Sequence, residues 1–404
     1  MADPLMKKRW NIVIAALVMQ LCLGTVYTWS VFKKPIMAAH GWSDTQSTLA
    51  FTIAIAVLGV SAAFGGRLVD RKGPKLVATI AGMLFGLGIL LSGAAESLGS
   101  LIGLYLTYGL IAGIGMGFGY VTPITILVRW FPDKRGLITG LAVMGFGAGG
   151  SVMGQIAPIL IESRGVPITF YVFGAAFLIL VTGAAQFYSN PPEGWSPEGF
   201  TPAQHKAAAG MAADLSTALR MPQFYVLWSL LFLNVTAGIA LISQASPMAQ
   251  EATKISAVAA GTLILVMLIF NGLGRLFWAA LSDKLGRKTV FLIIFASQVV
   301  VFAILPQVTN ILVFAIIACY ILLCYGGGFG TMPAYTADTF GTKHMGSIYG
   351  WILTAWSAAG VLGPMVMSYI RQTTESFGPA LYMASGLLAL GFVLTLLYRK
   401  PKLS

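Results

Sequence analysis

The chain has 404 residues, of which 57% are hydrophobic and only 9% are charged. Soluble domains carry about 25% charged residues, so the composition excludes a soluble protein and predicts an all-α protein that crosses a membrane many times. The net charge of +12 could indicate a nucleic-acid partner, but the distribution of the basic residues, given below, excludes one.

The amino-terminal region begins with Lys7, Lys8 and Arg9, and an apolar run follows. This run extends to Phe32, which is too long for the core of a signal peptide, so we expect a retained first transmembrane helix. Apolar runs long enough to span a bilayer recur twelve times. They lie near residues 10–32, 45–66, 76–95, 101–128, 137–161, 167–188, 223–246, 256–281, 289–308, 311–337, 345–370 and 377–398.

The longest polar segment, 189–221, is rich in proline, glycine and small residues. It divides the chain into two sets of six spans, so we expect an amino-terminal bundle at 1–188, a linker at 189–221 and a carboxy-terminal bundle at 222–404. The boundary between the ninth and tenth spans depends on one turn signal, residues 306–310.

The basic residues indicate the orientation. With a cytoplasmic amino terminus, nineteen of the 25 lysines and arginines fall on the cytoplasmic face. Five fall on the other face, and Arg275 lies inside a span. This bias predicts that both termini and the 189–221 linker are cytoplasmic, and it explains the positive charge as a topology signal.

An internal repeat relates the two halves. Asp70-Arg-Lys-Gly73, after the second span, matches Asp283-Lys-Leu-Gly286, after the eighth. Gly115-x-Gly-Phe-Gly119 in the fourth span matches Gly326-x-Gly-Phe-Gly330 in the tenth. Six spans separate each pair, so the repeats run in parallel, and we expect a binding site between the halves near the membrane midplane.

The turn Gly66-x-x-x-Asp70-Arg71-x-Gly73-x-Lys75 resembles the signature of the major facilitator superfamily, and its second copy strengthens the resemblance. We expect the aspartate of each copy to accept hydrogen bonds at a helix amino terminus in its own half and to hold the cytoplasmic side shut. The residues expected to form this gate are Asp70, Arg71, Asp283, Lys284 and Arg129.

Further motifs resemble the oxalate/formate antiporter family over nearly the whole chain, a family close to the proton-coupled monocarboxylate transporters. These motifs are Val26-Tyr27-Thr-Trp29, Arg129-Trp-Phe-Pro-Asp-Lys-Arg-Gly136, Asn190-Pro-Pro-Glu-Gly-Trp195, Pro222-Gln-Phe-Tyr-Val-Leu-Trp228, Asn271-x-x-x-Arg275 and Asp338-Thr-Phe-Gly-Thr342. The resemblance implies that Arg275 binds a substrate carboxylate and that Tyr27, Tyr120, Tyr325 and Phe329 line the pocket. Leu23, one turn before Tyr27, is a candidate for an apolar wall.

Two positions depart from the family pattern. Trp356 stands where the oxalate exchanger pattern has a lysine in the eleventh span, so a dianion would find one cation instead of two. Asn271 stands where the monocarboxylate transporters have an aspartate that relays the proton, and an amide cannot titrate. The first departure favours a monocarboxylate over oxalate, and the second leaves the proton carrier unassigned.

Arg275 lies eight residues before Asp283, which on a helix places it about 12 Å deeper in the membrane. All thirteen acidic residues fall at expected span ends or in loops, so none is available to pair with it. Either Arg275 extends to the surface or binds backbone carbonyls, or it holds an external carboxylate with two hydrogen bonds. We expect the second, because a monoanion and one arginine are together neutral.

These features predict a secondary transporter of small monocarboxylates, of lactate or pyruvate type, that works by proton-coupled symport. An exchanger without proton coupling is the alternative. No catalytic, phosphate-binding or metal-spaced motif is found, so we expect no enzyme and no cofactor. His40, His205 and His344 are expected as solvated loop residues, and Cys22, Cys319 and Cys324 as core residues. We expect a multi-pass protein of bacterial inner-membrane type, surrounded by lipid and functional as a monomer.

Overall fold

The computed structural model describes residues 4–197, 199–200 and 212–401. Within these ranges the chain forms helices and short connections, without strands. The first six spans are built from α1 (Pro4–Leu23), η1 (Gly24–Thr28), α2 (Trp29–His40), α3 (Asp44–Lys72), α4 (Pro74–Ser97), α5 (Leu101–Leu104), η2 (Tyr105–Ala112), α6 (Gly113–Trp130), α7 (Arg135–Arg164) and α8 (Val166–Ala185).

The remaining described chain begins with the short helix α10 (Leu215–Arg220) and continues into six further spans. These are built from α11 (Pro222–Thr253), α12 (Ala257–Leu285), α13 (Arg287–Ile304), η3 (Leu305–Gln307), α14 (Ile311–Phe340), α15 (Met345–Ile352), α16 (Thr354–Thr374) and α17 (Gly378–Leu397). Twelve helical segments of the described chain are long and apolar enough to cross a membrane, which confirms the predicted all-α membrane fold.

Local sequence explains where the helices begin and end. Ser43 and Gln46 form a capping box at the start of α3, and the Asn310 side chain caps α14 at the turn predicted between the ninth and tenth spans. The repeat-related glycines Gly73 and Gly286 end α3 and α12 with a φ of 87°, a conformation that favours glycine. The two halves therefore share the same sharp turn at equivalent places.

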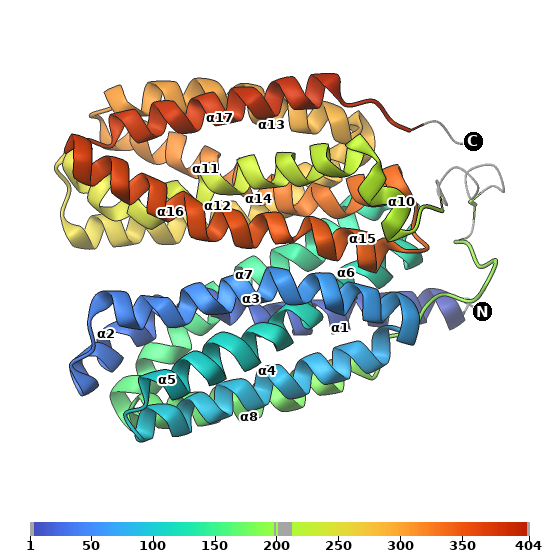
Figure 1. Ribbon diagram of the computed structural model, residues 1–404, viewed down its shortest axis with the longest axis horizontal. Helices are drawn as coiled ribbons and strands as arrows, with labels where there is room; N and C mark the ends of the chain where they lie inside the picture. Colours follow the sequence, from blue (N-terminus) through green and yellow to red (C-terminus); the bar gives the residue numbers. More distant parts are fainter. Residues whose placement is uncertain (1–3, 198, 201–211, 402–404) are drawn as a thin grey trace.

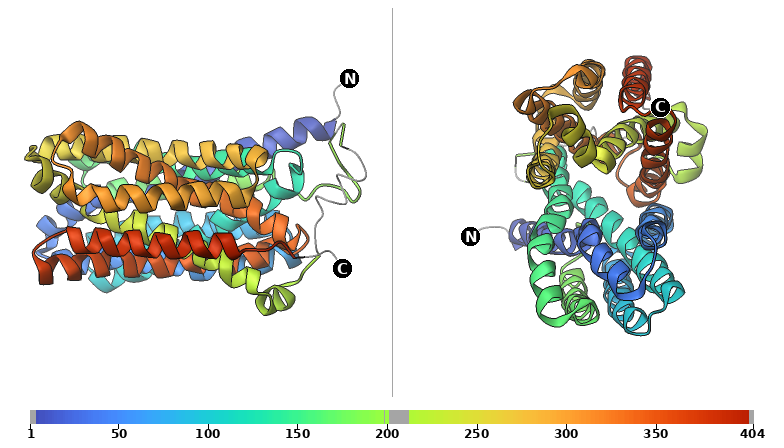
Figure 2. Two further views of the ribbon diagram at one scale, coloured as in Figure 1. Left: turned by 90° about the horizontal axis from the view of Figure 1, so that it is seen from above. Right: turned by 90° about the vertical axis from the view of Figure 1, so that its left-hand side faces the viewer.

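The helices gather into two groups. Figure 1 shows α1–α8 in one half of the molecule and α11–α17 in the other, and the end-on view of Figure 2 shows the same division. The start of α1 and the end of α17 lie at the same end of the molecule, which we call the terminal end. Across the seam between the halves, α12 packs on α7 and α15 packs on α3.

Glycines bring α12 and α14 into backbone contact within the second half. A Cβ built at Gly274 would lie 2.0 Å from the Leu323 carbonyl oxygen, and one at Gly330 would lie 2.1 Å from that of Arg275. The hydrophobic effect does not drive helices together when lipid already surrounds them. Close approach of the backbones stabilises the pair instead, through dispersion contacts. This contact fixes the backbone that carries Arg275.

We expect Gly274→Ala to destabilise the protein by about 1–3 kcal/mol, because the methyl group has no space beside the Leu323 carbonyl. Gly261→Ala on the same helix is the matched control, since a Cβ at Gly261 meets nothing within 4 Å. That control should be neutral or slightly stabilising, because alanine is the better helix former. Thermal unfolding of the purified variants measures both effects, and equal unfolding temperatures would contradict the packing argument.

Candidate functional site

Arg275 of α12 is fully buried, with 0% of its surface exposed. Its Nε donates to the Asn271 side-chain oxygen at 3.3 Å, and its Nη1 donates to the Val143 carbonyl of α7 at 2.9 Å. Its Nη2 has no hydrogen-bond partner, and within the described residues Arg275 forms no ion pair. Extension to the surface is therefore excluded, and the backbone satisfies only part of the guanidinium.

Aromatic rings surround this guanidinium. Its central carbon lies 5.3 Å from the centroid of the Phe329 ring and 5.9 Å from that of Phe146. Trp356 packs on Phe146 and Phe329 at centroid distances of 5.6 and 5.0 Å, and Tyr120 packs on Trp356 at 5.3 Å. The structure thus brings Tyr120, Phe329 and Trp356 together around Arg275, where cation–π attraction offsets part of the desolvation cost.

Two members of this aromatic cluster were not predicted. Phe146 of α7 touches Arg275, Tyr27, Tyr120 and Trp356. Its sequence context, Gly145-Phe-Gly147, repeats the Gly-Phe-Gly of the fourth and tenth spans, and that repetition could have identified it. Tyr349 of α15 is the second, since its hydroxyl faces that of Tyr120, and no motif indicated it.

A cavity of about 200 Å³ lies on the side of Arg275 that faces away from the terminal end. Asn271, Tyr27 and Tyr325 contribute to its wall, with apolar side chains and the glycines of α7 completing it. A Cβ built at the lining residue Gly147 would lie 3.5 Å from the Arg275 guanidinium carbon, so the cation lies directly behind this part of the cavity wall. Leu23 packs at Gly119 and does not line the cavity.

Several buried donors near Arg275 lack a partner at hydrogen-bonding geometry. They are the hydroxyls of Tyr27, Tyr120 and Tyr349 and the indole N–H of Trp356. The Tyr27 hydroxyl faces Arg275 and Tyr325, and the Tyr120 and Tyr349 hydroxyls face each other, so these groups satisfy one another in part. The Arg275 Nη2 and the Trp356 indole N–H have no acceptor, and because buried polar groups in proteins are almost always paired, these two need an explanation. A ligand that supplies acceptor oxygens provides one.

The terminal end is closed by the two repeat-related aspartates. Asp283 accepts from the backbone N–H groups of Gly136 and Leu137, both at 2.9 Å, at the start of α7. Asp70 accepts from the N–H groups of Gly346 at 3.2 Å and Ser347 at 2.6 Å, at the start of α15. Each carboxylate therefore interacts with a helix amino terminus.

The expectation that these contacts form within one half was wrong. Asp70 belongs to the first half and caps a helix of the second, and Asp283 does the reverse. The reason is the packing across the seam, because α3 lies on α15 and α12 lies on α7. The aspartates consequently join the two halves instead of stabilising each half alone.

The cations of this closure also differ in part from the expectation. Arg129 donates to Asp70 at 2.6 Å and crosses the seam to the carbonyls of Thr342 and Lys343. The side chains of Arg71 and Lys284, in contrast, are exposed and form no ion pair in the described chain, so the structure does not place them in the gate.

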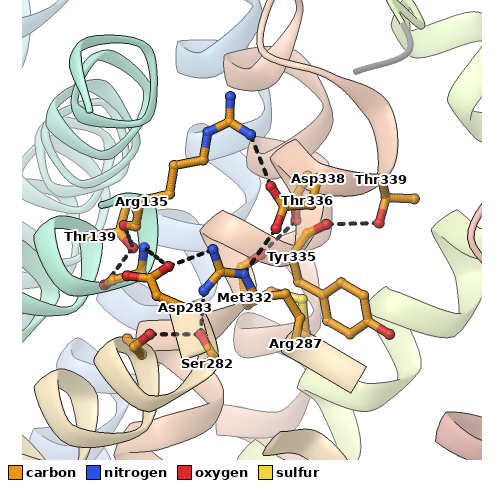
Figure 3. Close-up of polar contacts among 12 residues, drawn as sticks. Arg135, Thr139, Ser282, Asp283, Arg287, Met332, Tyr335, Thr336, Asp338 and Thr339 are labelled. Atoms are coloured by element: carbon orange, nitrogen blue, oxygen red, sulfur yellow. Dashed lines mark hydrogen bonds and ion pairs between the residues drawn. The ribbon is translucent and has the colours of Figure 1, made fainter. Parts of the chain in front are cut away.

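Arg287 takes the place expected for Lys284. It pairs with Asp283 at 2.7 Å and with Asp338 at 3.0 Å. Asp338 also pairs with Arg135 across the seam at 2.9 Å. Figure 3 shows Arg135 and Arg287 converging on Asp338 beside Asp283.

At the opposite end of the molecule, the described ion pairs stay within one half. They are Lys33–Asp44, His40–Glu96 and Arg371–Glu251. His40 was expected as a solvated loop residue, and this was wrong: it ends α2, contacts the buried Glu96 at 3.2 Å and stacks on Trp42. His344 remains in a connection, and His205 lies outside the described residues. In the described chain, the aspartate caps and the Arg135–Asp338 ion pair that join the halves therefore lie at the terminal end, and the ion pairs of the opposite end do not join them.

Comparison with known proteins agrees with this architecture. The chain is 28% identical to the oxalate:formate antiporter of Oxalobacter formigenes over 89% of its own length and 84% of that protein. It is 24% identical to the apicoplast pyruvate carrier 1 of Toxoplasma gondii, covering 92% of this chain and 86% of the carrier. The crystal structure of the E. coli fucose:proton symporter FucP has the same fold, with a TM-score of 0.71, 14% identity and coverage of 95% and 97%.

The family model described as Major Facilitator Superfamily matches residues 12–364 and 235–404. These matches span more than half of the chain, and the matched relatives and the structural neighbour are membrane transporters. The chain is a multi-pass membrane protein that belongs to the major facilitator superfamily.

Proposed function

We propose that this protein carries small monocarboxylates, of lactate or pyruvate size, across the membrane by alternating access and in symport with a proton. One observation carries the proposal: the buried Arg275 has an unpaired N–H and no acidic partner in the described chain, and it adjoins the cavity between the halves. A buried lone cation is costly, and an external carboxylate is the simplest partner that removes the cost.

The charge of the site favours a monoanion. Arg275 is the cation of the aromatic cluster, and Trp356 supplies only an indole N–H where a second cation would balance a dianion. One carboxylate neutralises one guanidinium, whereas a dianion would leave a negative charge among buried rings. The hydroxyl of Tyr27, which lines the cavity beside Arg275, suits a second oxygen on the substrate, as in a hydroxy or keto acid.

The transport cycle follows from the two ends of the molecule. We infer that the terminal end is cytoplasmic and that the described state is closed there, with substrate entering from the opposite side. An empty, charged Arg275 resists passage through a dry gate, and a bound carboxylate neutralises the guanidinium and permits the switch. The accompanying proton makes the transported cargo neutral as a whole. The proton travels on the substrate or on a group outside the immediate site, and one chain with two halves suffices as a monomer.

Exchange without a proton is the second candidate. Asn271 cannot titrate, and the described residues place no carboxylate beside Arg275. A carrier whose site has no titratable acid can still change between its two open states when one anion leaves and another binds. The name of the antiporter relative agrees with this alternative.

Uptake into proteoliposomes separates the two. We expect labelled lactate to accumulate only with an inward proton gradient, and excess oxalate to leave that uptake intact. Uptake that ignores the gradient but is accelerated by internal carboxylate would favour exchange. Inhibition by oxalate at concentrations similar to lactate would contradict the argument from a single cation.

A further inference from the structure

The end of α3 and the start of α4 carry basic side chains that the gate does not use. Arg67, Arg71, Lys72 and Lys75 are all exposed, and their side chains form no ion pair in the described chain. Asp70 is the acid among them, and it is already held by Arg129 and the start of α15. The four cations therefore form an uncompensated positive patch.

An apolar groove of about 450 Å³ lies along α3 on the side of these cations nearer the membrane interior, between α3 and the η2–α6 segment. Val57, Val60 and Phe64 form much of its α3 wall, and Val60 and Phe64 are 51% and 61% exposed. Ser61 also lines it, but its hydroxyl donates to the Leu58 carbonyl at 3.1 Å. The groove thus presents apolar surface at the depth of the membrane interior.

The groove and the cations lie on one face of α3. Val57, Val60, Phe64, Arg67 and Arg71 are spaced by three or four residues, which places them in one stripe along the helix. Arg71 lies about 10 Å beyond Phe64 along the axis, at the end of the helix. The stripe therefore changes from apolar to cationic where the helix leaves the hydrocarbon layer.

We propose that this stripe is a binding site for one anionic phospholipid. The acyl chain lies in the groove, and Arg67 and Arg71 bind the phosphate, since guanidinium groups hold phosphate oxygens with paired hydrogen bonds. The positive patch favours an anionic headgroup over a zwitterionic one, whose own cation it repels. In this proposal the phosphate is the partner of Arg71, which takes no part in the gate.

A second groove differs from this one in the charge at its end. The groove between α11, α16 and α17 is also apolar, with about 260 Å³. Arg371 follows its lining residue Met367 by one turn, but Arg371 is paired with Glu251 at 2.8 Å. Its cation is already neutralised, so the same headgroup chemistry predicts no preference for anionic lipid there.

Native mass spectrometry of the purified full-length protein, titrated with phosphatidylglycerol or phosphatidylcholine, tests the site. We expect one phosphatidylglycerol to bind at least tenfold more tightly than phosphatidylcholine. The double variant Arg67→Gln/Arg71→Gln should weaken phosphatidylglycerol binding at least tenfold. Lys34→Gln/Arg164→Gln is the matched control, because it removes two exposed, unpaired cations at the opposite end and should leave binding unchanged.

A further variant tests the role of the groove in lipid binding while Arg67 and Arg71 remain in place. Val60→Trp places a large side chain in the groove and should weaken phosphatidylglycerol binding severalfold. Inorganic phosphate in excess should not displace the lipid, whereas displacement would reveal a free-phosphate site and overturn the lipid assignment. Equal binding by the wild type and the Arg67/Arg71 variant, or equal binding of the two lipids, would also overturn it.

Discussion

Replacing Arg275 by alanine is expected to abolish carboxylate uptake while the protein still folds. The lost guanidinium is the cation proposed to bind the substrate, and truncating one partner of a buried charge pair costs about 2–5 kcal/mol, so uptake should fall on the order of 100-fold. Folding should persist because Arg275 has only Asn271 and the Val143 carbonyl as hydrogen-bond partners in the described chain. Uptake by proteoliposomes and thermal unfolding in detergent measure the two effects separately.

Two further variants sharpen this test. Arg275→Lys keeps the charge but loses the planar pair of donors, so it should transport less than the wild type and more than the alanine variant. Arg164→Ala removes an exposed arginine with no ion-pair partner in the described chain and should transport normally. Normal uptake by Arg275→Ala would disprove the site, and its failure to fold would show that the arginine is structural.

The second large effect concerns the closed terminal end. Asp70→Asn and Asp283→Asn are each expected to open it, because each removes charge-assisted bonds to a helix amino terminus of the other half. Hydrogen bonds to charged groups contribute about 1.5–3 kcal/mol each, so the open population should rise tenfold or more. A Thr139→Cys reporter, buried at the seam in the wild type, should react correspondingly faster with a water-soluble thiol reagent.

The background of this experiment is low, because the native cysteines Cys22, Cys319 and Cys324 are buried and can be replaced by alanine. Asp44→Asn is the matched control: its carboxylate pairs with Lys33 at the opposite end and within one half. It should leave the reaction rate of the reporter unchanged. Unchanged labelling in both gate variants would mean that apolar packing across the seam, and not the aspartates, keeps this end closed.

The contacts made by Asp70 and Asp283 should also affect the rate of transport. A carrier must open and close both ends in turn, so a variant that stays open at the terminal end should bind substrate but move it slowly. Ser347→Ala is a milder change, since it removes one hydroxyl that donates to Asp70 at 2.6 Å and leaves the backbone donors in place. Its effect on the reporter should fall between those of the wild type and Asp70→Asn.

The sequence by itself determined the spans, the repeat and the isolated cation. Hydropathy and helix length are local properties, so the twelve membrane-spanning helices and the turns at Gly73 and Gly286 follow from short stretches of residues. The isolation of Arg275 could also be foreseen, because every acid of the chain lies outside the expected span interiors.

The tertiary structure alone decided which groups meet across the seam. Asp70 binds residues 276 and 277 positions later, and Arg275 binds the carbonyl of Val143, 132 positions earlier. No hydropathy pattern encodes such pairs, because they depend on which helix faces are buried against each other. The sequence therefore predicted a gate and an isolated arginine. Only the packing of α3 on α15 and of α12 on α7 showed that the gate joins the halves. The same packing decided which groups surround the arginine.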